Sequence, residues 1–197
     1  MNWALLLQVI GTTLGLLYLY LEYKANIWLW LIGLLMPLVH GILYFQKGLY
    51  ADAMMNVYYV LAGLYGWIVW KNNRPQGKPM PISNTPWKVA AALLLVYAVL
   101  HIGLFCFLYY FTDSKVPILD SFTTALSMVA MWMLSRKYVE QWLVWLLVDA
   151  VTVGLYFYKG IPITGGLYLV YCTLAVAGYF RWRRMMRENE NSVSLQA

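Results

Sequence analysis

Charged side chains are scarce in this sequence. Asp, Glu, Lys and Arg together make up 11% of the 197 residues, while 62% are hydrophobic and 17% are aromatic. Soluble proteins carry about 25% charged residues. A soluble domain of this length could not cover so much apolar surface, and the composition therefore excludes a soluble globular protein.

Motifs that carry enzymatic chemistry are also missing. The sequence contains no HExxH, no GxSxG and no paired His/Asp cluster, and it has no Walker-type loop to hold ATP. The two cysteines, Cys106 and Cys172, lie in apolar segments without metal-ligand spacing, so we interpret them as packing residues. We therefore expect no enzyme, no catalytic residue, no metal and no cofactor.

Long apolar segments account for most of the chain. A membrane-spanning helix needs about 20 mostly apolar residues. Seven segments meet this length, at about 3–21, 26–45, 50–70, 87–111, 118–134, 139–158 and 161–180. The last of them contains no lysine, which argues against a retinal-type protein that needs one for its Schiff base. The sequence predicts an all-α polytopic membrane protein with seven transmembrane helices.

The basic residues divide unequally between the two sides of such a bundle. One side would hold only Lys47, Lys115 and Lys159. The other would hold Lys24, Lys71, Arg74, Lys78, Lys88, Arg136, Lys137, Arg181, Arg183, Arg184 and Arg187. Basic residues concentrate on the cytoplasmic side of membrane proteins. We therefore expect the N-terminus outside and the C-terminus in the cytoplasm, and we attribute the net charge of +6 to topology and not to nucleic-acid binding.

An internal repeat relates the two ends of the chain. The run YFQKG at Tyr44–Gly48 recurs as YFYKG at Tyr156–Gly160, an offset of 112. Without a gap, the same offset pairs Trp30 with Trp142, Tyr59 with Tyr171, Gly66 with Gly178 and Trp70 with Trp182. An odd helix between two three-helix halves gives both halves the same orientation, a 3+1+3 parallel repeat. The predicted parts are a first repeat at 1–71, a flexible loop at 72–86, a linker helix at 87–111, a second repeat at 112–183 and a tail at 184–197.

The sixth segment carries the strongest candidate site. Trp142, Trp145 and Asp149 are spaced i, i+3 and i+7, which places them on one helical face. A carboxylate in the bilayer centre costs about 2.5–3.5 kcal/mol, and no Lys or Arg lies at comparable depth to pair with it. Asp149 is therefore protonated, hydrogen-bonded or paired with a cationic ligand. Two aromatic rings beside a carboxylate are well suited to a flat cation.

Further polar side chains are expected to face the same interior. Asn56 and Tyr59 share a face of the third segment, and the amide of Asn56 can both donate and accept hydrogen bonds. Trp30 is the repeat partner of Trp142, and His40 follows Pro37, which we expect to break the helix in mid-span.

Thr124 shares a face with Asp120 and Ser127, where helix capping and close helix packing are the alternative roles. For His40, an interior structural histidine is the alternative.

Three runs resemble the PnuC family of bacterial vitamin transporters, over almost the whole chain. They are YGWIVW at Tyr65–Trp70, DSFTTALSMVAMWMLSRKYVEQWLVW at Asp120–Trp145 and GLYFYKG at Gly154–Gly160. The resemblance implies a SWEET-like bundle in the bacterial inner membrane. It also implies facilitated diffusion of a vitamin that cytoplasmic phosphorylation then traps, and places ligand contacts at Trp142, Trp145, Asp149 and Asn56.

The resemblance leaves the vitamin open between two cations. The nicotinamide riboside pattern has an amide where Asp149 stands and a glutamine where Asn56 stands. The run YADAMMNVYY at Tyr50–Tyr59 and the spacing of Trp142, Trp145 and Asp149 instead resemble the thiamine branch. We expect thiamine as cargo, with nicotinamide riboside as the alternative. A membrane sensor that binds the same ligand without transporting it, and an oligomeric assembly, also remain open.

Overall fold

The computed structural model describes the chain except for residues 1–2, 47–49, 74–76, 78, 159–161 and 195–197. Among helical residues, the side chains at 3–12, 36, 39–41, 43–46, 50–55, 162–164 and 192–194 also lie outside the description.

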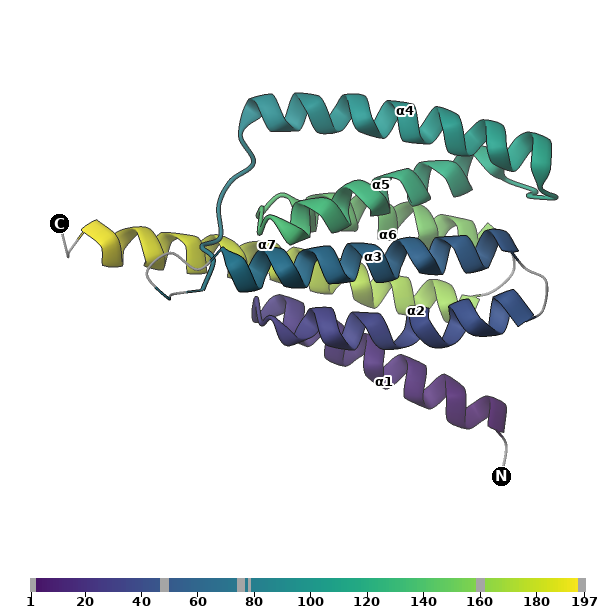
Figure 1. Cartoon of the computed structure of the whole chain (residues 1–197), viewed down its shortest axis with the longest axis horizontal. Coiled ribbons are helices and arrows are strands. Elements are labelled where there is room, and N and C mark those ends of the chain that lie inside the picture. Colours follow the sequence, from purple (N-terminus) through teal and green to yellow (C-terminus); the bar gives the residue numbers. More distant parts are fainter. Residues whose placement is uncertain (1–2, 47–49, 74–76, 78, 159–161, 195–197) are drawn as a thin grey trace. The chain divides into compact units, whose positions relative to one another are not determined.

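All elements of regular structure in the described residues are helices (Figure 1). There are seven of them: α1 (Trp3–Tyr23), α2 (Trp28–Gln46), α3 (Tyr50–Asn72), α4 (Trp87–Phe111), α5 (Pro117–Ser135), α6 (Gln141–Tyr158) and α7 (Pro162–Ser194). Each overlaps one of the apolar segments identified in the sequence. By length and composition, three helices within the described residues are able to cross a membrane, namely α4, α5 and α6.

Two helices differ from the sequence expectation. The predicted break at Pro37 is wrong, because α2 continues through this proline from Trp28 to Gln46. Proline removes one backbone hydrogen bond, and apolar helices tolerate this loss by small local adjustments. Helix α7 runs to Ser194, well past the expected end of its apolar segment near 180. The residues after Phe180 are mainly Arg, Met and Glu, which favour a helix, and no glycine or proline ends it.

The chain divides into two compact units, Met1–Met80 and Pro81–Ala197. In the first unit, α2 packs against both α1 and α3. In the second, α4 packs against α5, α5 against α6, and α6 against α7. Helix α4, expected as a linker, therefore lies against the helix that follows it.

The same tryptophan–glycine packing joins a pair of helices in each unit. In the first unit the Trp30 ring of α2 meets the Trp70 ring of α3 edge to face, with centroids 5.6 Å apart and planes at 89°. A Cβ atom on Gly66 of α3 would overlap the Trp30 ring, so only glycine fits there. We call Trp30, Gly66 and Trp70 the first Trp–Gly–Trp contact.

The second unit repeats this arrangement between α6 and α7. The rings of Trp142 and Trp182 meet edge to face at 5.8 Å and 88°. A Cβ atom on Gly178 would lie 2.6 Å from Cε2 of Trp142. The second Trp–Gly–Trp contact therefore consists of Trp142, Gly178 and Trp182. These three residues are the partners of the first contact at the offset of 112, so the sequence repeat corresponds to a shared mode of helix packing.

Hydrogen bonds fix the end of the segment that precedes α4. The backbone N–H of Ser83 donates to the carbonyl of Lys137 at 3.1 Å, and the N–H of Val139 donates to the carbonyl of Ser83 at 3.0 Å. Thr85 donates from both its backbone N–H and its hydroxyl to Oε2 of Glu140, at 2.8 and 2.7 Å. This part of the loop expected to be flexible is therefore attached to the turn between α5 and α6.

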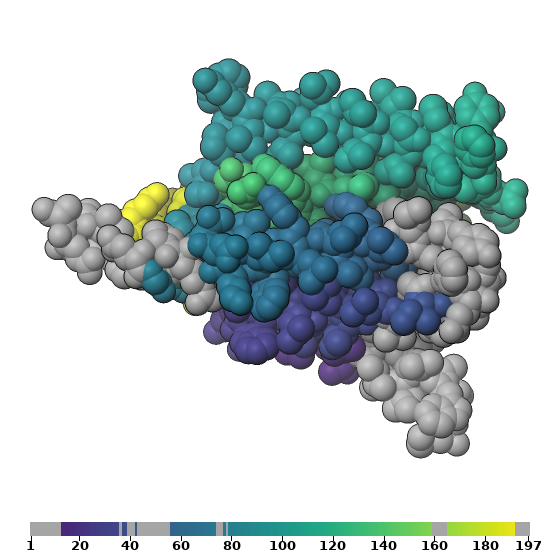
Figure 2. Space-filling model, in the orientation of Figure 1, coloured from purple at the N-terminus to yellow at the C-terminus, as the bar shows by residue number. Residues whose placement is uncertain are grey.

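Helix α4 has no buried residue along its 25 residues. Its side chains project along one edge of the second unit, coloured teal in the space-filling view (Figure 2). Large apolar side chains such as Leu95, Val99 and Ile102 are more than 60% exposed. Such a surface is unfavourable in water and suits contact with lipid.

Candidate functional site

Helix α6 holds the three strongest candidates of the sequence analysis, but they differ in their surroundings. Trp142 is 2% exposed and Asp149 is 8% exposed, while Trp145 is half-buried. Helix α6 packs against α7, and Trp142 lies in that contact. Two of the three side chains are therefore buried, and their shared role in a ligand site stays a prediction.

Trp142 is engaged in helix packing. Its ring lies on Gly178 and meets Trp182 of α7 in the second Trp–Gly–Trp contact. Its indole Nε1 is buried without a hydrogen-bond partner in the described part of the chain. On the face that covers Gly178, a ligand could reach this ring only by displacing α7. Ligand contact at Trp142 stays a prediction, and its packing role is the feature that sequence spacing did not reveal.

Asp149 lies beside two polar groups of α7. Its carboxyl group interacts electrostatically with the hydroxyl of Tyr171 and the thiol of Cys172. No hydrogen bond or ion pair joins Asp149 to any other residue that the structure describes. Trp145, one turn away, likewise has a buried indole Nε1 without a described partner.

Tyrosine rings continue from Asp149 along the contact between α6 and α7. The rings of Tyr156 and Tyr168 stack at 5.4 Å with an interplanar angle of 18°, and Tyr168 meets Tyr171 at 5.4 Å and 71°. We call Asp149, Tyr156, Tyr168, Tyr171 and Cys172 the α6–α7 polar seam. Sequence reasoning missed the residues of α7. The repeat contained the signal, because Tyr168 and Tyr171 stand at the offset of 112 from the predicted site residues Asn56 and Tyr59.

The candidates in the first unit lie on α2 and α3. Trp30 is 1% exposed and belongs to the first Trp–Gly–Trp contact. Asn56 is half-buried, and the half-buried Tyr59 meets Tyr58 at 5.5 Å. His40 lies on α2, with its side chain outside the described residues. Since Asp149 belongs to the other unit, the approach of Asn56 and Tyr59 to it stays a prediction.

The candidates on α5 include two residues with local structural roles. Oδ2 of Asp120 accepts a 2.7 Å hydrogen bond from the Ser114 hydroxyl in the preceding loop. The hydroxyl of Ser127 donates to the carbonyl of Thr123 on its own helix at 2.8 Å. These bonds agree with the capping and packing alternative for the two residues. Thr124 is half-buried on the same helix, and its ligand role stays a prediction.

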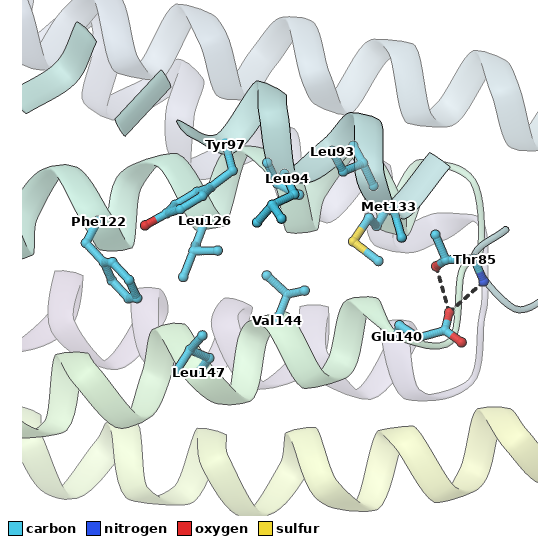
Figure 3. A pocket seen from close by; sticks show the side chains of 12 residues that line it. Thr85, Leu93, Leu94, Tyr97, Phe122, Leu126, Met133, Glu140, Val144 and Leu147 are labelled. Atoms are coloured by element: carbon cyan, nitrogen blue, oxygen red, sulfur yellow. Dashed lines mark hydrogen bonds between the residues drawn. The ribbon is translucent and has the colours of Figure 1, made fainter. Parts of the chain in front are cut away.

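A cleft of about 400 Å³ lies between α4, α5 and α6 (Figure 3). Its walls are apolar, and Thr85 and Glu140 provide a polar group at one end. We call it the α4 cleft. Nothing in the sequence pattern indicated it, because an apolar segment does not reveal which neighbours its side chains leave uncovered.

Comparisons with known proteins agree on one family. The family model described as nicotinamide mononucleotide transporter matches residues 5–184. The nicotinamide riboside transporter PnuC of Escherichia coli is 28% identical, over 92% of this chain and 87% of that protein. The riboflavin/roseoflavin transporter RibM of Streptomyces davaonensis is 29% identical, over 94% of this chain and 88% of its own length.

A solved structure shares the fold. The crystal structure of the vitamin B3 transporter PnuC superposes with a TM-score of 0.67, covering 89% of this chain and 79% of that one at 22% identity.

Proposed function

Because the chain belongs to the nicotinamide mononucleotide transporter family, as its resemblance to PnuC proteins predicted, we propose that it takes up a cationic B vitamin across the bacterial inner membrane. Its apolar helices and its family make it a multi-pass membrane protein. Transport is the activity that the named relatives share. The observation that supports a cationic cargo is Asp149, a carboxyl group on an apolar helix with no ion pair among the described residues.

Thiamine is the cargo that the polar groups favour. Thiamine and nicotinamide riboside are both flat heteroaromatic cations, whereas riboflavin, the cargo in the name of RibM, is neutral. A carboxylate in a low-dielectric site attracts a cation and gives a neutral ring no such gain. Asp149 therefore favours either cation over riboflavin. The presence of Asp149 and Asn56, in the pattern that resembles the thiamine branch, favours thiamine over nicotinamide riboside, which is the second candidate.

Within the site, each side chain would have a distinct task. Trp145 stacks on the cationic ring, and Asp149 supplies the counter-charge from one turn away. Trp142 would contact the same cationic ring. Asn56 and Tyr59 would approach from the other repeat and read the polar groups of the vitamin. Trp30, His40 and Thr124 would line the remaining surface.

The architecture proposed is the SWEET-like 3+1+3 bundle of seven transmembrane helices. Repeats at 1–71 and 112–183 are joined through a loop at 72–86 and a linker helix at 87–111, with a cytoplasmic tail at 184–197. The recurrence of the Trp–Gly–Trp contact in both units supports this division. Such a contact keeps two helices together while the halves rock against each other, so that the site opens alternately to either side. The distribution of Lys and Arg supports an external N-terminus and a cytoplasmic C-terminus.

No energy source is needed for this mechanism. The vitamin would enter down its gradient, and phosphorylation in the cytoplasm would prevent its return. A sensor that only binds the vitamin would use the same site without alternating access.

Calorimetric titration of the purified protein with thiamine, nicotinamide riboside and riboflavin tests the choice of cargo. We expect thiamine to bind most tightly, nicotinamide riboside next, and riboflavin at least about tenfold more weakly than either cation, which corresponds to about 1.4 kcal/mol. Preferred binding of riboflavin would rule out a cation site. Preferred binding of nicotinamide riboside would keep the cation site and replace thiamine as the cargo.

A further inference from the structure

The α4 cleft is separate from the α6–α7 polar seam. Its walls are formed by Leu93 and Leu94 of α4, Leu126 and Val129 of α5, and Val144 and Leu147 of α6. Figure 3 shows the labelled side chains, among them Leu94, Leu126 and Val144, directed into the space between the three helices. A volume of about 400 Å³ falls within the range of small-molecule sites, about 300–1,000 Å³.

The length of the α4 cleft along the axis of α5 matches the thickness of one bilayer leaflet. Phe122 and Met133 line it at positions eleven residues apart on α5. At about 1.5 Å per residue they are separated by about 16 Å along the helix axis. The hydrocarbon core of a bilayer is about 30 Å thick, so one leaflet contributes about 15 Å. A single acyl chain therefore has the length and the polarity to lie along this cleft.

The polar end of the α4 cleft lies at the turn between α5 and α6, where a lipid headgroup would be. Thr85 donates two hydrogen bonds to Glu140, and both go to Oε2. No described residue donates to the other carboxylate oxygen, Oε1. The guanidinium group of Arg136 lies over the Trp132 ring, 5.5 Å from its centroid. The cleft thus ends in a carboxylate with a free acceptor.

We propose that the α4 cleft binds a phospholipid with a primary ammonium headgroup, such as phosphatidylethanolamine. One acyl chain fills the apolar cleft, and the ammonium group donates a hydrogen bond to Glu140. A primary ammonium has three donors, whereas the quaternary ammonium of a choline headgroup has none. An anionic glycerol headgroup has no ammonium to donate and would add a negative charge beside the carboxylate. Charge and donor count therefore select one headgroup.

The bound lipid would complete the packing of α4. No residue of this helix is buried by the protein alone, and an empty cleft leaves its lining atoms without contacts. The acyl chain would supply those contacts between α4 and the pair α5–α6. Glu140, held in place by Thr85, would then couple the lipid headgroup to the segment that leads into α4.

Native mass spectrometry of the delipidated full chain tests this proposal, by titration with ethanolamine, choline and glycerol phospholipids of identical acyl chains. We expect the ethanolamine lipid to bind about tenfold or more tightly than the other two, because only its headgroup has an ammonium that can donate a hydrogen bond to the Glu140 carboxylate. Glu140→Gln keeps an oxygen that accepts from Thr85 but removes the charge, and it should abolish this preference. Asp113→Asn, at an exposed carboxylate, is the matched control and should leave the preference intact.

A second variant tests occupancy of the cleft independently of the headgroup. Val144→Phe fills the cleft from α6 and should reduce binding of all three lipids severalfold, while Leu143→Phe, at a side chain 44% exposed on the same helix, should not.

Equal binding of the three headgroups, or a preference that survives Glu140→Gln, would overturn the proposal. So would a Val144→Phe variant that keeps its lipids and changes the oligomeric mass, because a second copy of the chain would then occupy the cleft.

Discussion

Replacing Asp149 with asparagine should weaken thiamine binding by about 30-fold or more. Asparagine keeps the size of the side chain and its hydrogen-bonding oxygen but removes the charge. Loss of one partner from a buried charge pair costs about 2 kcal/mol at the low end of measured values, which corresponds to a factor of about 30. The affinity for nicotinamide riboside should fall less, because the pattern for that vitamin has an amide at this position. Calorimetric titration of both vitamins measures the two changes.

Asp120→Asn is the matched control for Asp149→Asn. Asp120 is also a carboxylate on a helix of the second unit, but it accepts a hydrogen bond from Ser114 and has a local structural role. We expect unchanged affinities in this variant. If Asp149→Asn leaves the affinities for thiamine and nicotinamide riboside unchanged, Asp149 is a structural residue and the site lies elsewhere.

The second large effect is expected for Trp142→Ala, which should lower the free energy of unfolding more than it lowers ligand affinity. Trp142→Ala removes the ring that fills the contact between Gly178 and Trp182. Truncation of a buried tryptophan to alanine costs about 3–5 kcal/mol through lost contacts and the cavity that remains. Trp145→Ala, at a half-buried ring without such a contact, should lower the melting temperature far less and reduce thiamine binding more. Thermal unfolding in detergent and titration together separate the two roles.

Glycine variants on α7 provide the independent check of this packing role. Gly178→Ala places a Cβ atom 2.6 Å from the Trp142 ring, and overpacking of this kind costs about 1–3 kcal/mol. Gly166→Ala on the same helix meets no atom within 4 Å and should leave the melting temperature unchanged or raise it slightly. Equal melting temperatures for the two variants would contradict the second Trp–Gly–Trp contact.

The sequence predicted the helices well because apolar runs of about 20 residues have few alternatives in a membrane. It placed the ends of α4 and α6 to within about two residues. Different definitions of a helix end differ by about the same amount. It failed at the end of α7, because hydropathy marks where the apolar segment stops and not where the helix stops. It also failed at Pro37, where a local rule on helix breaking was overridden by the helix around it.

The ligand roles of the candidate residues stay predictions, while the structure adds packing contacts that the sequence analysis did not identify. Spacing alone placed Trp142, Trp145 and Asp149 on one face, but spacing does not distinguish a ring that meets a ligand from a ring that meets the next helix. The neighbours decide this, and Gly178 and Trp182 are distant from Trp142 in sequence. The repeat linked these positions, because Trp30, Gly66 and Trp70 all recur at the offset of 112 as Trp142, Gly178 and Trp182. No sequence pattern predicted the α4 cleft, because a cleft depends on how α4, α5 and α6 pack against one another.

Counterflow in liposomes tests transport most directly. Purified protein is reconstituted into vesicles loaded with unlabelled thiamine, and labelled thiamine is added outside without ATP or an ion gradient. We expect labelled thiamine to accumulate transiently through exchange, and Asp149→Asn vesicles to accumulate far less of it. Binding of thiamine to the protein without any exchange across the vesicle membrane would contradict transport and leave a sensor of the same ligand.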